Sequence, residues 1–279
     1  SLQHVLEGYK IAPEIKEHGA SCSTFADWWA YKVEAYDAIP QNAALLNEAG
    51  INSVIKSDDA ELIRHMTKEA AKTIRYGNMP EAAALQAITR NSARELGIED
   101  RIGTLEVGKD GDLAIFNAHP FHAFARCDMT VIEGDIYFDR AQASTAVLPE
   151  VDEKAEPLTP IKILSAEERP APLDLLSSES GKYVLLNAHL HPVSGPDIAK
   201  GTLIIEDGKI TALGAEVDYQ EVGAKVIDLN GLHVYPGLID AGTTLGLTEI
   251  GRVKETSDYS ESGDFQADLR AGVGINPDS

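Results

Sequence analysis

A proline-rich acidic stretch divides this chain into two blocks, and it constrains the possible folds more than any other feature. Residues 146–181 hold five prolines among many Glu, Asp, Lys and Ser residues. Such a composition favours an extended linker over a packed element. We therefore expect two separate stretches of folded sequence, one on each side of this linker.

In the first block, from residue 18 to residue 117, short apolar runs alternate with helical periodicity. Residues 51–57 predict a strand. Residues 60–76 carry apolar side chains at helical spacing, and Gly77 is the expected end of that helix. A further short helix is expected to end at Gly97. Strands that alternate with helices are typical of parallel α/β architecture.

After residue 101 the pattern becomes that of β structure, punctuated by glycines. The runs that predict short strands are 112–117, 129–138, 183–187, 201–206, 209–213 and 225–229. Asp207-Gly208, between two of these runs, is a strong signal for a hairpin turn. The second block is therefore expected to be largely β.

Composition excludes several classes of partner. The chain has 279 residues, 43% of them hydrophobic, so it can bury a sizeable core. Its formal net charge of -21 disfavours nucleic acid and anionic membrane surfaces as partners. No run approaches the roughly 18 consecutive apolar residues of a membrane span. Cys22 and Cys127 are too few for a disulfide framework. We expect a soluble protein whose compartment stays open, because the amino terminus reads as truncated and a signal peptide could precede it.

Two segments of the first block resemble parts of the amidohydrolase superfamily. Residues 101–114, RIGTLEVGKDGDLA, are similar to the segment by which these enzymes leave their barrel and re-enter their β-sandwich. Residues 51–64 resemble the eighth barrel strand, whose aspartate binds the metal and acts on the attacking water. The resemblance places Asp58 in that position. Without it, Asp58 and Asp59 before a helix read as a solvated N-cap.

The first 32 residues carry a further resemblance. Residues 3–10, QHVLEGYK, are similar to the sixth barrel strand of imidazolonepropionase-like amidohydrolases, whose histidine is a zinc ligand. This implies that His4 binds a divalent metal, expected to be zinc, which imidazole suits. The segment STFADWWAYK resembles a loop after the seventh strand and implies that Trp28, Trp29 and Lys32 contact substrate. The alternative is that the tryptophans only pack that loop against the barrel rim.

The second block resembles the beginning of another unit of the same superfamily. The segments GTLIIEDGKI and VYPGLIDA look like its amino-terminal sandwich and the entry into its first barrel strand. The sequence then departs from the family, because Gly242-Thr243-Thr244 stands where the family has a His-x-His metal pair. Glycine has no side chain and threonine is a poor zinc ligand. The resemblance therefore implies a degenerate second unit without the usual metal site.

Another His-x-His sequence, His189-Leu190-His191, lies in the predicted sandwich. Its place ahead of the hairpin, away from the mouth of barrel strand one, argues against a catalytic role. Histidines two apart on a strand nevertheless share a face and could bind adventitious metal there.

The implied fold class is α/β plus β, with a partial (β/α)8 TIM barrel and a composite β-sandwich. Residues 112–138 are expected to share a sheet or core with residues 182–235. Three strands do not close an eight-stranded barrel, so a homo-oligomer, or association with the remainder of a longer parent protein, is expected. The domains in chain order are barrel strands six to eight at 1–100, carboxyl-terminal sandwich strands at 101–145, a linker at 146–181, amino-terminal sandwich strands of a second unit at 182–240, and the start of a second barrel at 241–279.

The resemblance implies a metal-dependent hydrolase that uses activated water against a non-peptide carbon–nitrogen bond. The substrate would be a small molecule, either a cyclic amide or an N-acyl compound. Asp58 would be the catalytic carboxylate and would bind the metal with His4. The other ligands are expected upstream of residue 3 in a longer protein, so the isolated chain could be inactive. Two alternatives stay open: a catalytically incomplete scaffold or interaction module, and a dipeptidase on the same scaffold.

Overall fold

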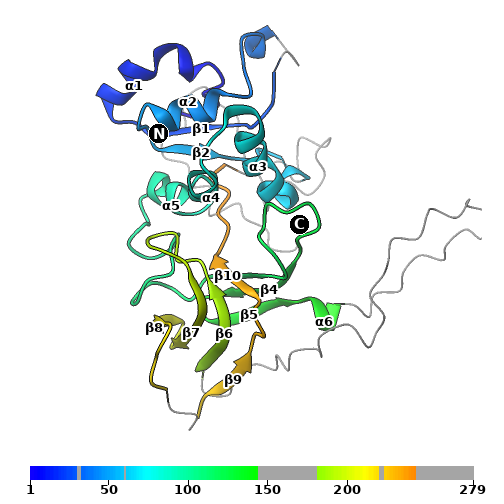
Figure 1. Cartoon of the computed structure of the whole chain (residues 1–279). Coiled ribbons are helices and arrows are strands. Elements are labelled where there is room, and N and C mark those ends of the chain that lie inside the picture. The colour runs from blue at the N-terminus through cyan, green and yellow to red at the C-terminus, as the bar shows by residue number, and fades with distance from the viewer. Residues whose placement is uncertain (30–32, 60, 144–180, 220–222, 243–279) are drawn as a thin grey trace, which may run out of the picture. The chain divides into compact units, whose positions relative to one another are not determined.

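The computed structural model describes residues 1–29, 33–59, 61–143, 181–219 and 223–242. These residues form two compact units (Figure 1). One unit comprises residues 1–103 together with the segment that begins at Leu238, and the other comprises residues 104–237. Nearly all of the predicted linker, and the predicted second barrel beyond residue 242, lie outside the described residues.

The first unit is α/β. Its elements in chain order are the 3-10 helix η1 (Gly8–Ile11), α1 (Ala12–His18), β1 (Cys22–Thr24), the 3-10 helix η2 (Val33–Ala35), α2 (Asn42–Glu48), β2 (Ser53–Ile55), the 3-10 helix η3 (Leu62–His65), α3 (Met66–Gly77), α4 (Glu81–Gln86) and α5 (Arg90–Leu96). Of the helices in the described residues, none is long and apolar enough to cross a bilayer.

The two strands of this unit are parallel neighbours. Cys22 pairs with Ser53 and Thr24 with Ile55, and every residue of β1 and β2 is buried. Leu2 forms an isolated parallel bridge with Cys22, so the first residues of the chain lie on the other side of β1. Burial on both faces explains why the strand sequences are not alternating in polarity. The chain thus places the segments around residues 2, 23 and 54 side by side.

The predicted helix at 60–76 is corrected in two respects. It is divided into η3 and α3, because His65 has non-helical backbone angles of φ -119° and ψ 16°. The left-handed residue that caps α3 is Asn78, at φ 52°, and not Gly77. Gly77 is instead required by packing, since a Cβ there would lie 2.4 Å from the Cβ of Ala44. The predicted end of α5 at Gly97 is confirmed, with φ 72°.

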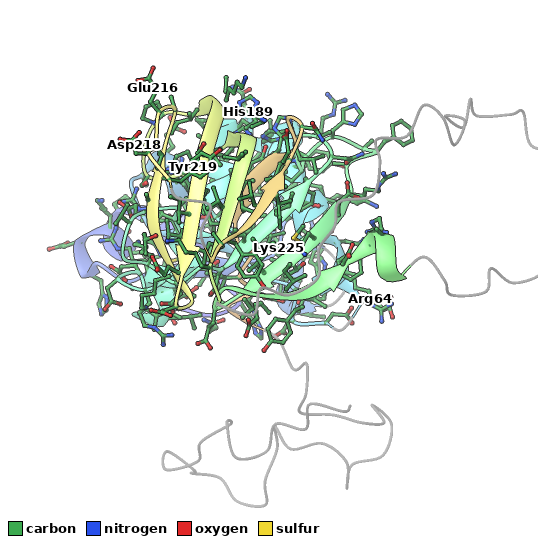
Figure 2. The ribbon with its side chains drawn as sticks, turned by 90° about the horizontal axis from the view of Figure 1, so that it is seen from below. Arg64, His189, Glu216, Asp218, Tyr219 and Lys225 are labelled. Carbon is green, nitrogen blue, oxygen red and sulfur yellow. The ribbon has the colours of Figure 1, made fainter. Side chains whose placement is uncertain are left out.

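The second unit is an eight-stranded mixed sheet with one short helix. Its elements are β3 (Leu113–Phe116), β4 (Cys127–Ile132), β5 (Asp135–Asp139), α6 (Arg140–Ala143), β6 (Tyr183–Leu190), β7 (Ile198–Glu206), β8 (Lys209–Gly214), β9 (Lys225–Asp228) and β10 (His233–Pro236). The strand order is β5-β4-β3-β10-β6-β7-β8, and β9 pairs with β6. In the side-chain view His189 marks β6, Lys225 marks the start of β9, and Glu216, Asp218 and Tyr219 lie on the segment after β8 (Figure 2).

The strands before and after the predicted linker share this sheet. β10 is antiparallel to β3, with Tyr235 opposite Ala114, and parallel to β6 on its other side. One hydrophobic core joins the two blocks, since it contains Leu113 and Met129 as well as Leu203 and Val234. The described residues around 112–138 and 182–235 therefore fold as one structural unit.

Two turns decide how the strands of this sheet are divided. The prediction of a single strand at 129–138 is wrong. Glu133 and Gly134 have φ of 49° and 84° and turn the chain between β4 and β5. The predicted hairpin at Asp207-Gly208 is confirmed, with φ of 52° and 75°. The two turns meet closely, since a Cβ on Gly134 would lie 2.7 Å from the Cα of Gly208.

Candidate functional site

His4 and Asp58 meet in the first unit although they are far apart in the sequence. Nε2 of His4 lies 2.9 Å from Oδ2 of Asp58. Both residues have a left-handed backbone, with φ of 54° and 55°. Non-glycine residues adopt this conformation uncommonly, and strained backbone of this kind clusters at functional sites. The two side chains predicted as metal ligands are thus brought together.

Lys56 is the third member of this site, and the sequence reasoning missed it. Its Nζ lies 3.2 Å from Oδ1 of Asp58, and only 2% of its side chain is exposed. Nζ also lies 4.9 Å from the centroid of the Phe25 ring, within reach of a cation–π interaction. A lysine inside the apolar run at 51–57 was the available signal, because a buried lysine needs a partner for its charge.

Gly242 makes room for the Lys56 side chain. A Cβ on Gly242 would lie 2.7 Å from Cδ of Lys56, so any larger residue at position 242 would compete with the lysine for space. The backbone N–H of Asp58 donates to the carbonyl of Gly242 at 2.8 Å. At the position where the resemblance predicted a lost His-x-His pair, the glycine thus leaves space for the lysine that pairs with Asp58.

Asp240 fixes the segment that carries this glycine. Its Oδ1 accepts hydrogen bonds from the backbone N–H of Ser57 at 3.2 Å and of Gly242 at 3.1 Å. The Ser57 hydroxyl donates to its other carboxylate oxygen. Asp240 thus ties the end of the second block to the residue that precedes Asp58.

As arranged, these side chains do not fit a divalent metal. Both oxygens of Asp58 are engaged, one by His4 and one by the ammonium of Lys56, whose fixed positive charge a metal ion would have to displace. Among the described residues, the group of three or more His, Cys, Asp or Glu side chains able to hold a metal lies elsewhere, in the second unit. Metal binding by His4 and Asp58 therefore stays a prediction, and it requires ligands from outside the described residues.

The predicted substrate-binding residues are only partly described. The rings of His4 and Phe25 stack at 5.6 Å, and those of Phe25 and Trp28 at 4.1 Å. Trp28 therefore belongs to an aromatic stack that begins at His4. Trp29 is 46% exposed, and Lys32 lies outside the described residues. Contact of these three residues with substrate stays a prediction.

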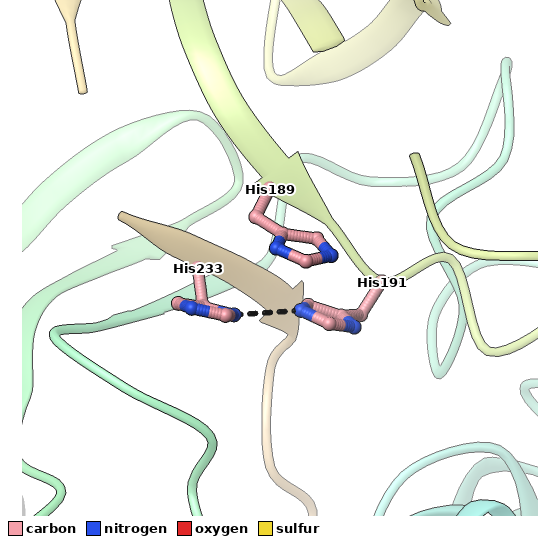
Figure 3. Close-up of side chains that lie close together, drawn as sticks. All are labelled: His189, His191 and His233. Carbon is pink, nitrogen blue, oxygen red and sulfur yellow. Dashed lines mark hydrogen bonds between the residues drawn. The ribbon is translucent and has the colours of Figure 1, made fainter. Parts of the chain in front are cut away.

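A cluster of three histidines lies in the second unit (Figure 3). His189 is the second-last residue of β6, and His191 directly follows that strand. His233 is the first residue of β10 and pairs with His189. Leu190 and Val234 belong to the hydrophobic core, so the three imidazoles extend from the opposite face of the sheet. The sequence pointed to the first two histidines. It missed His233, because only the pairing of β10 with β6 brings that residue near.

Hydrogen bonds define the protonation of this cluster. Nδ1 of His191 lies 2.8 Å from Oδ2 of Asp197, and its Nε2 lies 2.9 Å from Nδ1 of His233. We assign the tautomers from this network: His191 donates to the carboxylate and accepts from His233. Burial lowers the pKa of His191 to about 4, because it outweighs the opposing effect of Asp197, and His189 and His233 lower it further. Burial also lowers the pKa of His233.

Residues 38–147 match the sequence model of the amidohydrolase family. This match covers 110 of the 279 residues of the chain. Amidohydrolase tasK of Hapsidospora irregularis is 29% identical in a 247-residue alignment that covers 83% of this chain and 24% of that protein. D-hydantoinase of Geobacillus stearothermophilus is 44% identical over 75 residues, 27% of this chain and 15% of that enzyme.

Imidazolonepropionase of Maricaulis maris is 39% identical in a 77-residue alignment that covers 26% of this chain and 19% of that enzyme. This match supports the resemblance to the imidazolonepropionase-like branch. A solved amidohydrolase from Thermotoga maritima MSB8 has a TM-score of 0.47 and 31% identity, covering 50% of this chain and 36% of its own. The chain spans no more than 24% of the length of the curated relatives named here.

Proposed function

We propose that the full-length protein containing this chain is a hydrolase that acts on a non-peptide carbon–nitrogen bond, in a cyclic amide or a small N-acyl compound. The family match of residues 38–147 supports this reaction class. So do the names of relatives, which include D-hydantoinase, imidazolonepropionase and 5'-deoxyadenosine deaminase.

The observation that carries the proposal is the contact between His4 and Asp58, with Nε2 2.9 Å from Oδ2. In the proposed reaction the Asp58 carboxylate accepts a proton from the attacking water and passes it to the leaving nitrogen. His4 and Lys56 hold the two oxygens of that carboxylate and so fix its orientation. Because His4, Asp58 and Lys56 as arranged do not fit a metal, any zinc at this site would depend on ligands from outside the described residues, and no step is assigned to it.

The larger architecture is part of the same proposal. We infer that residues 1–100 are the last three strands of a TIM barrel and that the eight-stranded sheet is a composite sandwich of two tandem units. The alignment with tasK supports the tandem arrangement, because a match over 83% of the chain cannot fit within residues 1–145. One relative therefore carries both blocks in this order.

The test is hydrolysis of cyclic amides and N-acyl amino acids by the full-length protein and its Asp58→Asn variant. We expect kcat/KM to fall about 100- to 10,000-fold, the usual contribution of general acid–base catalysis. Asp59→Asn is the matched control, since Oδ1 of Asp59 only accepts the N–H groups of Glu61 and Leu62, and an amide oxygen can do the same. Equal losses in both variants would argue against the assigned role of Asp58.

A second candidate function is a catalytically incomplete scaffold. The Lys56–Asp58 ion pair beside Gly242 favours it, because the lysine neutralises the carboxylate where the family would hold a metal. Metal analysis of wild type and Asp58→Ala separates the two candidates. Zinc lost in Asp58→Ala supports the hydrolase, whereas absence of both Asp58-dependent zinc and turnover supports the scaffold. Dipeptides in the same substrate panel test the dipeptidase alternative.

A further inference from the structure

The three histidines of the second unit converge from two paired strands. One nitrogen of each ring can be chosen so that all three lie within 4.8 Å of one another. The strand pairing fixes their backbones, since the N–H groups of His189 and His191 donate to the carbonyls of Leu232 and Val234, both at 2.9 Å. We propose that His189, His191 and His233 bind one divalent transition-metal ion, at a site separate from the His4–Asp58 pair.

The chemistry of the donors restricts which ion this site would take. Three imidazoles, with no carboxylate or thiolate among the ligands, suit zinc, copper, nickel or cobalt and disfavour magnesium and calcium. Three protein ligands also leave one position of a tetrahedral ion open to water or to a small ligand. The proposed site therefore resembles metal sites that keep one coordination position free, and not structural sites with four protein ligands.

Asp197 prepares His191 for this role. Its carboxylate accepts the Nδ1 proton of His191 at 2.8 Å, which directs the lone pair of Nε2 toward His233. A carboxylate behind a ligating histidine fixes the ring and its tautomer, and such partners are a recurrent part of histidine metal sites.

Binding needs side-chain rotation and a shift of one proton. A tetrahedral zinc ion with Zn–N bonds of about 2.0–2.1 Å places its ligand nitrogens about 3.3 Å apart. The His191–His233 contact of 2.9 Å must widen, and the third nitrogen must move inward. The proton on Nδ1 of His233 moves to Nε2 of the same ring, which leaves the imidazole neutral and conserves protons.

The competing interpretation is a purely structural histidine stack. The ring planes of His189 and His191 differ by 15°, and those of His191 and His233 by 11°, as in stacked aromatic packing. A stack does not require any ion and does not respond to metal. Direct titration therefore separates the two interpretations.

The experiment is titration of Co²⁺ and Zn²⁺ into the chelator-treated chain, followed by visible absorption and calorimetry. We expect one ion per chain, with cobalt bands of a four-coordinate site. Asp197→Asn should weaken binding about 10- to 100-fold, the usual effect of removing such a carboxylate partner. His233→Ala should abolish the cobalt bands. His189→Gln provides a second test if His233→Ala fails to fold as judged by circular dichroism.

Controls address both the residue type and the other candidate site. His122→Ala removes an exposed histidine of the same unit and should leave binding unchanged. Asp58→Ala should also leave metal binding unchanged, so this titration tests the three-histidine site separately from the proposed hydrolase activity. Absence of a bound ion in the wild type, or wild-type binding in both His233→Ala and His189→Gln, would overturn the proposal.

Discussion

Two histidine–carboxylate pairs within the described residues have nearly equal contact distances but differ in burial. His4 and Asp58 are 2.9 Å apart, and His191 and Asp197 are 2.8 Å apart. In the first pair the histidine side chain is 56% exposed and the aspartate 35%. In the second pair the histidine side chain is 8% exposed and the aspartate 57%. Only the pair in the second unit therefore has a buried side chain, the imidazole of His191.

The third partner of each pair determines what the pair can do. Asp58 meets the Lys56 ammonium, and a fixed positive charge beside a carboxylate opposes the arrival of a metal cation. His191 meets the neutral imidazole of His233, which offers a further nitrogen lone pair. The same two residue types thus form an ion-paired carboxylate in one unit and a cluster of nitrogen ligands in the other.

The largest expected effect is a loss of folding stability at acidic pH, which arises from His191. The folded-state pKa of His191 is about 4, below its usual 6.5. The unfolded chain therefore takes up a proton first as the pH falls. This contribution to stability is complete above pH 6.5 and declines between pH 6.5 and 4, by about 3 kcal/mol at most. Urea denaturation at pH 7 and pH 4.5 should show a larger loss for wild type than for His191→Phe. Equal losses would contradict the assignment.

A smaller effect is expected from removing each carboxylate. Asp58→Ala leaves the buried Lys56 ammonium without its carboxylate and should cost about 2 kcal/mol, less than for a fully buried pair because Asp58 is partly exposed. Asp197→Ala removes a hydrogen bond to a neutral ring and should cost about 1 kcal/mol. Chemical denaturation at pH 7 compares the two. A greater cost for Asp197→Ala would show that Asp197 contributes more to stability than Asp58, contrary to this expectation.

The smallest effect tests the space beside Lys56. Gly242→Ala places a Cβ 2.7 Å from Cδ of Lys56, so the lysine must shift, at a cost of about 1 kcal/mol. Gly195→Ala is the matched control, because no atom lies within 4 Å of its built Cβ. In thermal denaturation, Gly242→Ala should have a lower Tm than the wild type, whereas Gly195→Ala should have an unchanged Tm. A Tm unchanged in both variants would show that Lys56 does not depend on the glycine.

Local signals in the sequence predicted part of this fold. Gly97 and Asp207-Gly208 were identifiable because a left-handed backbone favours those residue types. Conversely, the turn at Glu133-Gly134 was missed, since the apolar residues on both sides read as one continuous strand. Strand β10, with four residues ending at Pro236, is too short to carry a pattern of its own.

The candidate sites depended on information that local patterns do not hold. The approach of His4 to Asp58 was anticipated only through the family resemblance. Lys56 and His233 were missed because their partners lie on other segments, and only the folded arrangement identifies them. Side chains that need a tertiary partner are therefore the least predictable members of both sites.

The pairing of β10 with β3 also bears on how the chain is made. Strands β3 to β5 are synthesised well before β10, so the edge of β3 remains open until the second block has been translated. An open strand edge is a template for aggregation, and pairing between distant segments forms slowly. We therefore expect residues 1–145, when produced without the second block, to accumulate in inclusion bodies.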